Sequence, residues 1–214
     1  MQRLIVSMAD AREEAFLKRV LPSSFLAYAA RYRNDGARLR TLNCLFLLYE
    51  HLKSGNIDPH TLSLCRMEGG KPFLDPCVLH FSYSHSGELI ALLISDVPCG
   101  VDVEAVRSAR NTDRNTDRII EKYFSIAEQE QYAASSDRAL FFTALWTKKE
   151  AVGKCLGTGV FPHSLAALDV THTQTCTLSY NGQRYCLSLA LDKEASFKGS
   201  PELAEGISIF ECFE

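Results

Sequence analysis

Two acidic side chains lie two residues apart in the segment Gly-Val-Asp-Val-Glu at residues 100–104. On a β-strand, alternate residues share a face, so Asp102 and Glu104 should point one way while Val101 and Val103 point the other. Neighbouring carboxylates repel each other, and a cation between them relieves the repulsion. Mg²⁺ suits such a site because it takes one or a few carboxylates and completes its shell with water and substrate phosphates. A strand with one solvated face is the alternative interpretation.

A third carboxylate and a cation occur in Trp-Thr-Lys-Lys-Glu-Ala-Val-Gly-Lys at residues 146–154. On a helix, Trp146, Glu150 and Lys154 recur every fourth residue and share a face. An exposed helix would carry the same Glu-to-Lys pair as a surface stabilisation. Trp146 is the only tryptophan of the chain and favours a face that meets the body of the protein. This pattern suggests that Glu150 and Lys154 lie near an interior cleft, where they could complete a metal–phosphate site.

Two further segments carry groups that bind phosphate. Residues 81–87 read Phe-Ser-Tyr-Ser-His-Ser-Gly and offer hydroxyls, an imidazole and backbone N–H groups at a predicted strand end. A Ser/His hydrolase is disfavoured, because adjacent residues rarely form a Ser–His pair and the sequence holds no GxSxG elbow. Gly70-Lys71-Pro72 is a predicted turn that displays a lysine. Either segment could also be an ordinary polar turn.

The elements that must position these residues follow from hydrophobic spacing, caps and turn residues. A capping box at Asp10 and Glu13 predicts the first helix, and one at Ser125 and Glu128 predicts a helix after residue 124. The other helices are expected at about 24–33, 37–53, 116–123 and 137–156, the first helix ending near residue 21. Strands are expected at about 5–8, 61–66, 81–84, 88–95, 100–106, 175–180, 184–190 and 207–212.

Helices followed by strands occur twice in this order, which predicts an α+β protein. The length of 214 residues suits one large domain or two half-sized lobes that share a core. Residues 107–117 are polar and are the best candidate for a flexible loop or a boundary between lobes.

Composition and hydrophobic patterning indicate which partners and which cellular location to expect. The net charge of −3 argues against nucleic acid as the main partner. The N-terminal apolar stretch is too short for a signal peptide, and the run Leu89–Ile94 is too short to span a bilayer, so we expect a cytoplasmic protein without a membrane partner. The eight cysteines are scattered without a CxxC pair, which is typical of reduced thiols that act as small apolar groups.

Taken together, the ordered motifs Gly-Lys-Pro, Ser-His-Ser-Gly, Gly-Val-Asp-Val-Glu and Trp-Thr-Lys-Lys-Glu-Ala-Val-Gly-Lys resemble those of the Sfp-type 4′-phosphopantetheinyl transferases. The matched stretch runs from Gly70 to Gly159. The resemblance implies two similar α+β lobes that form a pseudo-dimer, with the active site between them. The lobes would span residues 1–99 and 100–214, the second carrying the metal site. The resemblance also implies a monomer.

Residue roles follow from the same resemblance. Asp102, Glu104 and Glu150 would hold Mg²⁺, with Mn²⁺ as the alternative, and Glu150 would also be the catalytic base. Lys154 would act in catalysis and bind the pyrophosphate of coenzyme A. The remaining coenzyme A contacts would come from Arg40, Lys71, Ser84 and His85. The lysines that the family often carries in its second helix are absent here, and only Arg31 and Arg33 are basic in that segment.

The implied reaction moves 4′-phosphopantetheine from coenzyme A to a serine of an apo acyl or peptidyl carrier protein and releases 3′,5′-ADP. We expect the carrier to dock near residues 107–124, through the arginines there and through Tyr123 and Phe124. Two alternatives remain open: a Mg²⁺-dependent phosphohydrolase acting on coenzyme A or a nucleotide, and a non-catalytic coenzyme A-binding module. Glu128 matches an acid of the family, but a helix-capping role accounts for it.

Overall fold

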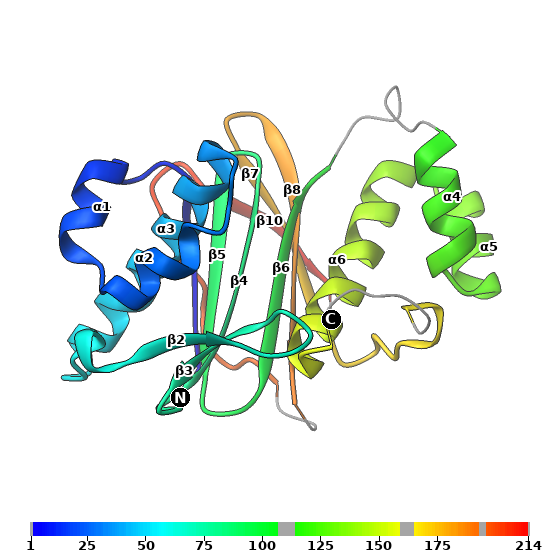
Figure 1. The fold of residues 1–214 in the computed structure, drawn as a ribbon. Helices are drawn as coiled ribbons and strands as arrows, with labels where there is room; N and C mark the ends of the chain where they lie inside the picture. The colour runs from blue at the N-terminus through cyan, green and yellow to red at the C-terminus, as the bar shows by residue number, and fades with distance from the viewer. Residues whose placement is uncertain (1, 107–113, 159–164, 193–195, 214) are drawn as a thin grey trace.

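Helices and strands are grouped in separate blocks along the chain, which confirms the predicted α+β class (Figure 1). The structure is a computed structural model, and it describes residues 2–106, 114–158, 165–192 and 196–213. Within these residues the strands form two four-stranded sheets and one two-stranded hairpin. In the view of Figure 1, α1–α3 lie to the left of the strands and α4–α6 to the right.

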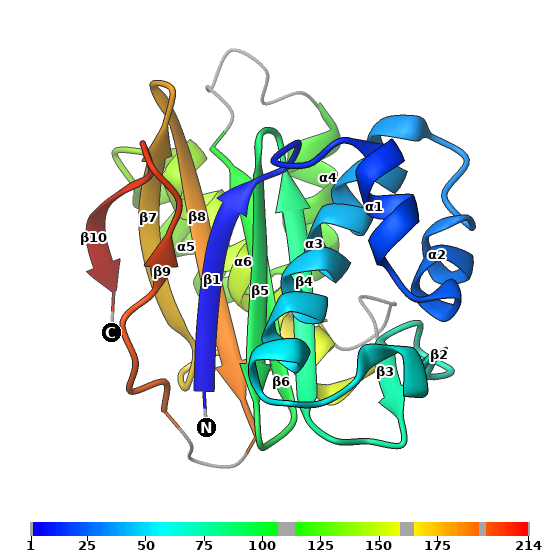
Figure 2. The same cartoon turned by 90° about the vertical axis from the view of Figure 1, so that its left-hand side faces the viewer.

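The first half of the chain builds a sheet with the strand order β4-β5-β1-β9, covered by three helices (Figure 2). Its strands are β1 (Gln2–Met8), β4 (His80–Ser86), β5 (Leu89–Ser95) and, from the C-terminal part of the chain, β9 (Glu202–Leu203). Its helices are α1 (Glu14–Val20), α2 (Ser23–Ala29) and α3 (Asp35–Ser54). A 3₁₀ turn at Pro59–Thr61 leads into the hairpin of β2 (Ser63–Arg66) and β3 (Pro72–Asp75).

Helix α3 supplies the largest apolar face to this half. It begins at a cap in which the Asn34 side chain accepts a hydrogen bond from the Ala37 amide, and it ends at Gly55. Leucines at helical spacing on α3 are buried in one cluster with residues of β4 and β5. They are Leu42, Leu45, Leu48 and Leu52, which are no more than 1% exposed.

The second half repeats this plan. Its sheet has the order β10-β7-β8-β6 and contains β6 (Cys99–Ala105), β7 (Gln174–Tyr180), β8 (Gln183–Leu191) and β10 (Ser208–Phe213). Its helices are α4 (Arg114–Tyr123), α5 (Ile126–Ala134) and α6 (Arg138–Leu156), followed by a 3₁₀ turn at Leu165–Ala167. In each half, a first strand leads through helices to a hairpin whose second strand returns antiparallel to the first strand.

The two sheets meet where β4 lies beside β6 (Figure 1). Serine side chains of β4 take the place of a backbone ladder there: the hydroxyls of Ser82 and Ser86 accept hydrogen bonds from the amides of Val101 and Ala105, at 3.1 and 3.0 Å. A single buried cluster continues across the junction and includes Leu93 of one sheet and Val101 of the other. The two halves therefore share a core, and β4 and β6 are held at a fixed distance.

Most predicted elements are present, and the differences have local causes. The capping box predicted at Asp10 is wrong, because α1 follows Glu13 and has no side-chain cap. The Ser125–Glu128 capping box is confirmed at α5. Strand β4 continues through Ser86, paired with β5, so the predicted polar turn after residue 84 is extended strand instead. The predicted polar loop ends earlier than expected, at the start of α4; residues 107–113 lie outside the described residues.

Candidate active site

Strand β6 and helix α6 bring the predicted acids and lysine together at the junction of the two sheets. Gly100 makes this possible: a Cβ at that position would lie 1.9 Å from the Ala151 carbonyl oxygen and 2.5 Å from the Cys155 amide. The helix can therefore lie directly on the strand. A cavity of about 460 Å³ opens beside them and is lined by Asp102, Glu104, Glu150 and Lys154 among others.

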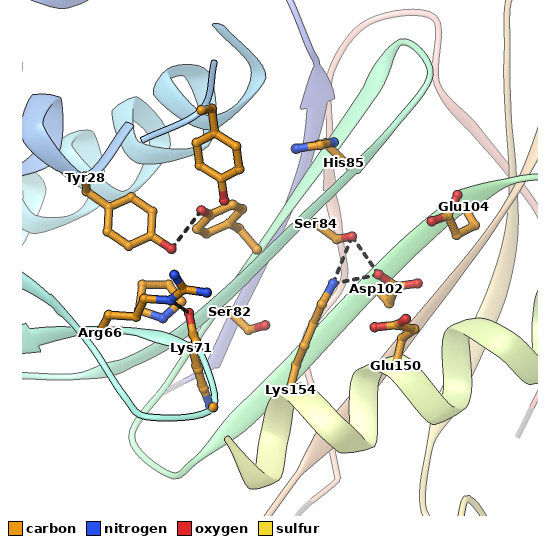
Figure 3. A pocket seen from close by; sticks show the side chains of 15 residues that line it. Tyr28, Arg66, Lys71, Ser82, Ser84, His85, Asp102, Glu104, Glu150 and Lys154 are labelled. Atoms are coloured by element: carbon orange, nitrogen blue, oxygen red, sulfur yellow. Dashed lines mark hydrogen bonds and ion pairs between the residues drawn. The ribbon is translucent and has the colours of Figure 1, made fainter. Parts of the chain in front are cut away.

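Lys154 is the centre of the hydrogen-bond network in this cavity (Figure 3). Its ammonium donates to Asp102 Oδ1 at 2.6 Å, to Ser84 Oγ at 3.1 Å and to the Val101 carbonyl at 3.2 Å. The Ser84 hydroxyl donates to the same Asp102 oxygen at 2.7 Å. Burial alone would lower the pKa of Lys154, but the carboxylates of Asp102, Glu150 and Glu104 together raise it, so this lysine is charged.

Asp102 is 3% exposed, so the strand face that carries the acids is not the solvated face of the alternative interpretation. Val101 and Val103 are fully buried on the opposite side, as the alternation predicted. The second carboxylate oxygen of Asp102, Oδ2, is buried and has no hydrogen-bond partner among the described residues. A buried oxygen of this kind costs free energy unless something coordinates it.

Burial raises the pKa of Glu150 to about 7, and the negative charges of Asp102 and Glu104 add to this, while Lys154 opposes it. Such a carboxyl group exchanges its proton near neutral pH, which is the property a general base needs. Figure 3 shows Glu150 beside Asp102, with Lys154 reaching past it from the same helix.

A metal ion would find suitable donors among these acids. Asp102 offers the unpartnered Oδ2, and the raised pKa of Glu150 is typical of carboxylates that share a site without a cation. In the chain segments that the structure describes, no three His, Cys, Asp or Glu side chains already lie in a ready-made metal-binding group. The donor chemistry fits Mg²⁺ or Mn²⁺, which prefer carboxylate oxygens.

The residues predicted to contact coenzyme A differ in whether they line this cavity. Ser84, His85, Lys71 and Lys154 line it, whereas Arg40 is not among its lining residues. Burial lowers the pKa of His85, and the positive charge of Arg40 lowers it further, so the imidazole is neutral at pH 7. The Nε atom of Arg40 is buried, and no described residue forms a hydrogen bond with it.

Lys71 makes hydrogen bonds that its predicted role did not include. Its ammonium donates to the carbonyls of Cys99 and Cys155, at 2.8 and 3.4 Å, and burial lowers its pKa. The turn that carries it lies against the end of α6, since a Cβ on Gly69 would lie 2.0 Å from the Gly157 carbonyl oxygen. Lys71 therefore ties the β2–β3 hairpin to the second half of the chain as well as lining the cavity.

Several lining residues were missed by sequence reasoning. They are Tyr28, Tyr32, Tyr83 and Arg66. Figure 3 shows Tyr28 and Arg66 on the side of the cavity away from the acids, and the Tyr83 hydroxyl donates to the Tyr28 hydroxyl at 3.4 Å. Arg66 donates from Nε to the Gly70 carbonyl at 2.8 Å, which fixes its guanidinium beside the cavity. Spacing could not reveal this group, because its members come from α2, the adjoining loop, β2 and β4. Arg31, one of the two arginines in the segment where the family often carries lysines, stacks its guanidinium on the Tyr28 ring at 4.0 Å from the ring centre.

Glu128 lies outside this cavity and has a structural role. One carboxylate oxygen accepts from the Ser125 amide at 2.7 Å, and the other pairs with the fully buried ammonium of Lys149 at 2.9 Å. Phe124 is 2% exposed and stacks on Phe142, so its predicted part in a docking surface is wrong.

The cysteines of the described residues are partly as expected. Burial raises the pKa of the Cys99 and Cys186 thiols to about 12, which keeps them protonated. Cys77, in contrast, is exposed. None of the helices in the described segments combines the length and apolar character that crossing a bilayer requires.

Comparison with known proteins identifies the family. Residues 98–204, half of the chain, match the model of the 4′-phosphopantetheinyl transferase superfamily. The chain is 30% identical over 186 residues to the 4′-phosphopantetheinyl transferase gsp of Aneurinibacillus migulanus, covering 85% of this chain and 71% of that protein. It is 35% identical over 140 residues to the 4′-phosphopantetheinyl transferase AcpT of Escherichia coli K12, covering 62% and 68%.

Among solved structures, the holo-[acyl-carrier-protein] synthase of Thermotoga maritima matches 45% of this chain and 64% of that chain, with a TM-score of 0.31 and 19% identity. That likeness is too low to support conclusions. The residues matched by the family model contain β6 and α6 with the acids and the lysine of the cavity. The chain belongs to the 4′-phosphopantetheinyl transferase superfamily.

Proposed function

We propose that this phosphopantetheinyl transferase takes 4′-phosphopantetheine from coenzyme A and attaches it to a serine of an apo acyl or peptidyl carrier protein. The observation that carries the proposal is the cavity in which Glu150, with a pKa raised to about 7, lies beside Asp102, Glu104 and the charged Lys154. These groups combine a proton acceptor with charges suited to a pyrophosphate.

Coenzyme A would lie along the cavity with its pyrophosphate at the acidic end and its nucleotide at the other. The lysine charge favours the pyrophosphate oxygens at Lys154, and the Tyr28, Tyr32 and Arg66 end offers aromatic faces and a fixed guanidinium to the adenosine phosphate. Ser84 lies at the acidic end, bonded to Asp102 and Lys154, and neutral His85 can donate or accept a hydrogen bond in the cavity.

Asp102, Glu104 and Glu150 would hold Mg²⁺, or Mn²⁺ in its place. When bound, the ion neutralises charge on the phosphate oxygens. The unpartnered Asp102 Oδ2 supports this assignment.

The chain's own residues account for the rest of the reaction. Glu150, ionised above about pH 7, takes the proton of the carrier serine hydroxyl as that oxygen attacks the β-phosphorus of coenzyme A. The bond from that phosphorus to the 3′,5′-ADP oxygen breaks, and Lys154 stabilises the charge that gathers on the leaving group. Asp102 and Ser84 hold the ammonium of Lys154 in place.

We also propose the division into lobes at residues 1–99 and 100–214, which the repeated topology supports. The cavity between β4, β6 and α6 would then lie between the lobes. We still expect the protein to be a cytoplasmic monomer that does not bind nucleic acid. The carrier would approach from the α4 side. The arginines expected to dock it are Arg107, Arg110, Arg114 and Arg118, of which Arg107 and Arg110 lie outside the described residues.

The test is incubation of the purified protein with coenzyme A, Mg²⁺ and a panel of apo carrier proteins, followed by intact mass measurement of each carrier. The proposal predicts a gain of one phosphopantetheine group that EDTA prevents. Cleavage of coenzyme A without any modified carrier would favour the phosphohydrolase. Binding of coenzyme A without either change would favour the binding module.

A further inference from the structure

Strand β4 presents three serines on one face toward β6, at residues 82, 84 and 86. Each hydroxyl makes a hydrogen bond to β6, but their partners differ. Ser82 meets only backbone, as the acceptor of the Val101 amide at 3.1 Å. Ser84 donates to Asp102 Oδ1 at 2.7 Å and also accepts from Lys154. Ser86 donates to Glu104 Oε2 at 2.7 Å and accepts from the Ala105 amide at 3.0 Å.

The two bonds of Ser86 together define the direction of its single hydroxyl hydrogen. A serine hydroxyl has one hydrogen and two lone pairs. One lone pair accepts the amide of Ala105, which is on β6 next to Glu104, so the oxygen is held against the strand. The hydrogen then points to the Glu104 carboxylate, in a charge-assisted bond of 2.7 Å.

The side chain of Glu104 has more conformational freedom than that of Asp102. Its side chain has three rotatable bonds and is only partly buried, whereas Asp102 is short, buried and held by both Ser84 and Lys154. A carboxylate that must meet a cation binds it best when its orientation is set beforehand by a hydrogen-bond partner.

We propose that Ser86 is a positioning residue that orients the Glu104 carboxylate for the divalent cation, an inference that rests on the proposed role of Asp102, Glu104 and Glu150 as metal ligands. Ser86 is not among the residues that line the cavity, so it acts through Glu104 rather than on the substrate. Ser82 is the control for the carboxylate bond: unlike Ser86 it lines the cavity, but it has the same type, strand and face, and among the described residues its hydroxyl bonds the Val101 amide and no carboxylate.

The experiment is a titration of the full-length protein with Mn²⁺ in the presence of coenzyme A, in which unbound Mn²⁺ is measured by electron paramagnetic resonance. Ser86→Ala should weaken Mn²⁺ binding by about tenfold, the lower end for loss of a ligand's hydrogen-bond partner. Ser86→Thr keeps the hydroxyl and should bind close to wild type. Ser82→Ala should leave the Mn²⁺ affinity unchanged. Thermal unfolding of each variant checks that the fold is intact.

Wild-type Mn²⁺ affinity in Ser86→Ala would overturn the inference, and so would equal weakening in Ser86→Ala and Ser82→Ala, which would make the serines a general connection between the sheets. Glu104→Gln separates this failure from that of the proposed function. If Glu104→Gln binds Mn²⁺ as well as the wild type does, the metal site itself is wrong. If only Glu104→Gln is weakened, the metal site stands and the role of Ser86 does not.

Discussion

Glu150 is held in an environment that disfavours its charge. Burial is the main cause, and Asp102 and Glu104 add repulsion that the single ammonium of Lys154 does not offset. The result is a carboxyl group that is half protonated near pH 7 in the absence of a cation. This state costs stability at higher pH, as expected of a group kept for chemistry rather than for folding.

The cost predicts a pH-dependent effect of Glu150→Gln. The folded pKa of about 7 lies above the unfolded value of 4.5, so the folded protein binds more protons between these pH values and loses stability as pH rises through that window. Glutamine cannot ionise, so the variant does not lose stability in this way as the pH rises. In EDTA, the free energy of unfolding of Glu150→Gln relative to wild type should rise by about 2 kcal/mol from pH 5 to pH 8, measured by urea unfolding. The exposed control Glu130→Gln should show no such trend, and a pH-independent difference for Glu150→Gln would contradict the assignment.

Lys154 should influence Glu150 directly. Its positive charge lowers the pKa of that carboxyl group, so Lys154→Met is predicted to raise the pKa of Glu150 above its wild-type value. Carboxyl ¹³C NMR of labelled glutamate in metal-free protein measures the shift. A pKa that stays the same or falls in Lys154→Met would show that the two side chains do not interact.

The acids and the lysine could be predicted from the sequence because their spacing matches one strand face and one helix face. Tyr28 and Arg66 could not, because their place in the cavity depends on how α2 and β2 fold back toward β4. A sequence motif could also not predict the hydrogen bonds from Lys71 to the carbonyls of Cys99 and Cys155.

At the scale of elements, the contact of α6 with β6 sets the distance between Glu150 and Asp102. Gly100 allows it, since an added methyl group would collide with the Ala151 carbonyl and the Cys155 amide, both backbone atoms that cannot turn away. This glycine of β6 is thus a packing requirement. Sequence reasoning included it only as part of a motif.

Gly100→Ala should therefore move α6 away from β6. We expect a loss of about 1–3 kcal/mol in the free energy of unfolding, typical of overpacking, and a transfer rate reduced by more than the stability loss alone would cause. The matched control is Gly55→Ala, because Gly55 has φ −88° and its nearest atoms are 3.5 Å from an added Cβ. Equal effects of the two substitutions on the transfer rate would show that the close contact at Gly100 is not needed.

Element boundaries followed from the sequence where caps were self-contained. Ser125 with Glu128 and Gly157 each cap a helix through local geometry, whereas α3 begins at Asp35 behind the Asn34 cap, earlier than the predicted start at about residue 37. Asp10 and Glu13 have the right spacing, but the chain after β1 enters α1 only at Glu14, so spacing alone was misleading there. Strand β4 exceeded its predicted end because pairing with β5 outweighed the turn preference of Ser-His-Ser-Gly.

For the whole molecule, the shared core and the β4–β6 junction join two topologically equivalent halves. The β2–β3 hairpin adds a second connection, through Gly69 against Gly157 and through Lys71. The order of helices and strands predicted the α+β class and the family resemblance implied two lobes, but no local pattern could show that serine hydroxyls join the two sheets or that β9 returns to β1.

Lys71→Met should loosen the hairpin from the second half. Loss of the two carbonyl contacts should speed hydrogen–deuterium exchange at residues 66–71 and raise the KM for coenzyme A. The control is Lys18→Met, which removes an exposed lysine that pairs with Glu14 on α1. Unchanged exchange in the hairpin of Lys71→Met would mean that Lys71 does not tie the halves together.

The most direct test of the central claim is single-turnover transfer of phosphopantetheine by Glu150→Gln, with coenzyme A affinity measured on the same protein. Glutamine keeps the size of the side chain but cannot accept the serine proton. We predict coenzyme A binding within a few-fold of wild type and transfer slowed by about 10²-fold or more, the usual effect of losing a general base. Transfer at the wild-type rate by folded Glu150→Gln would contradict the account.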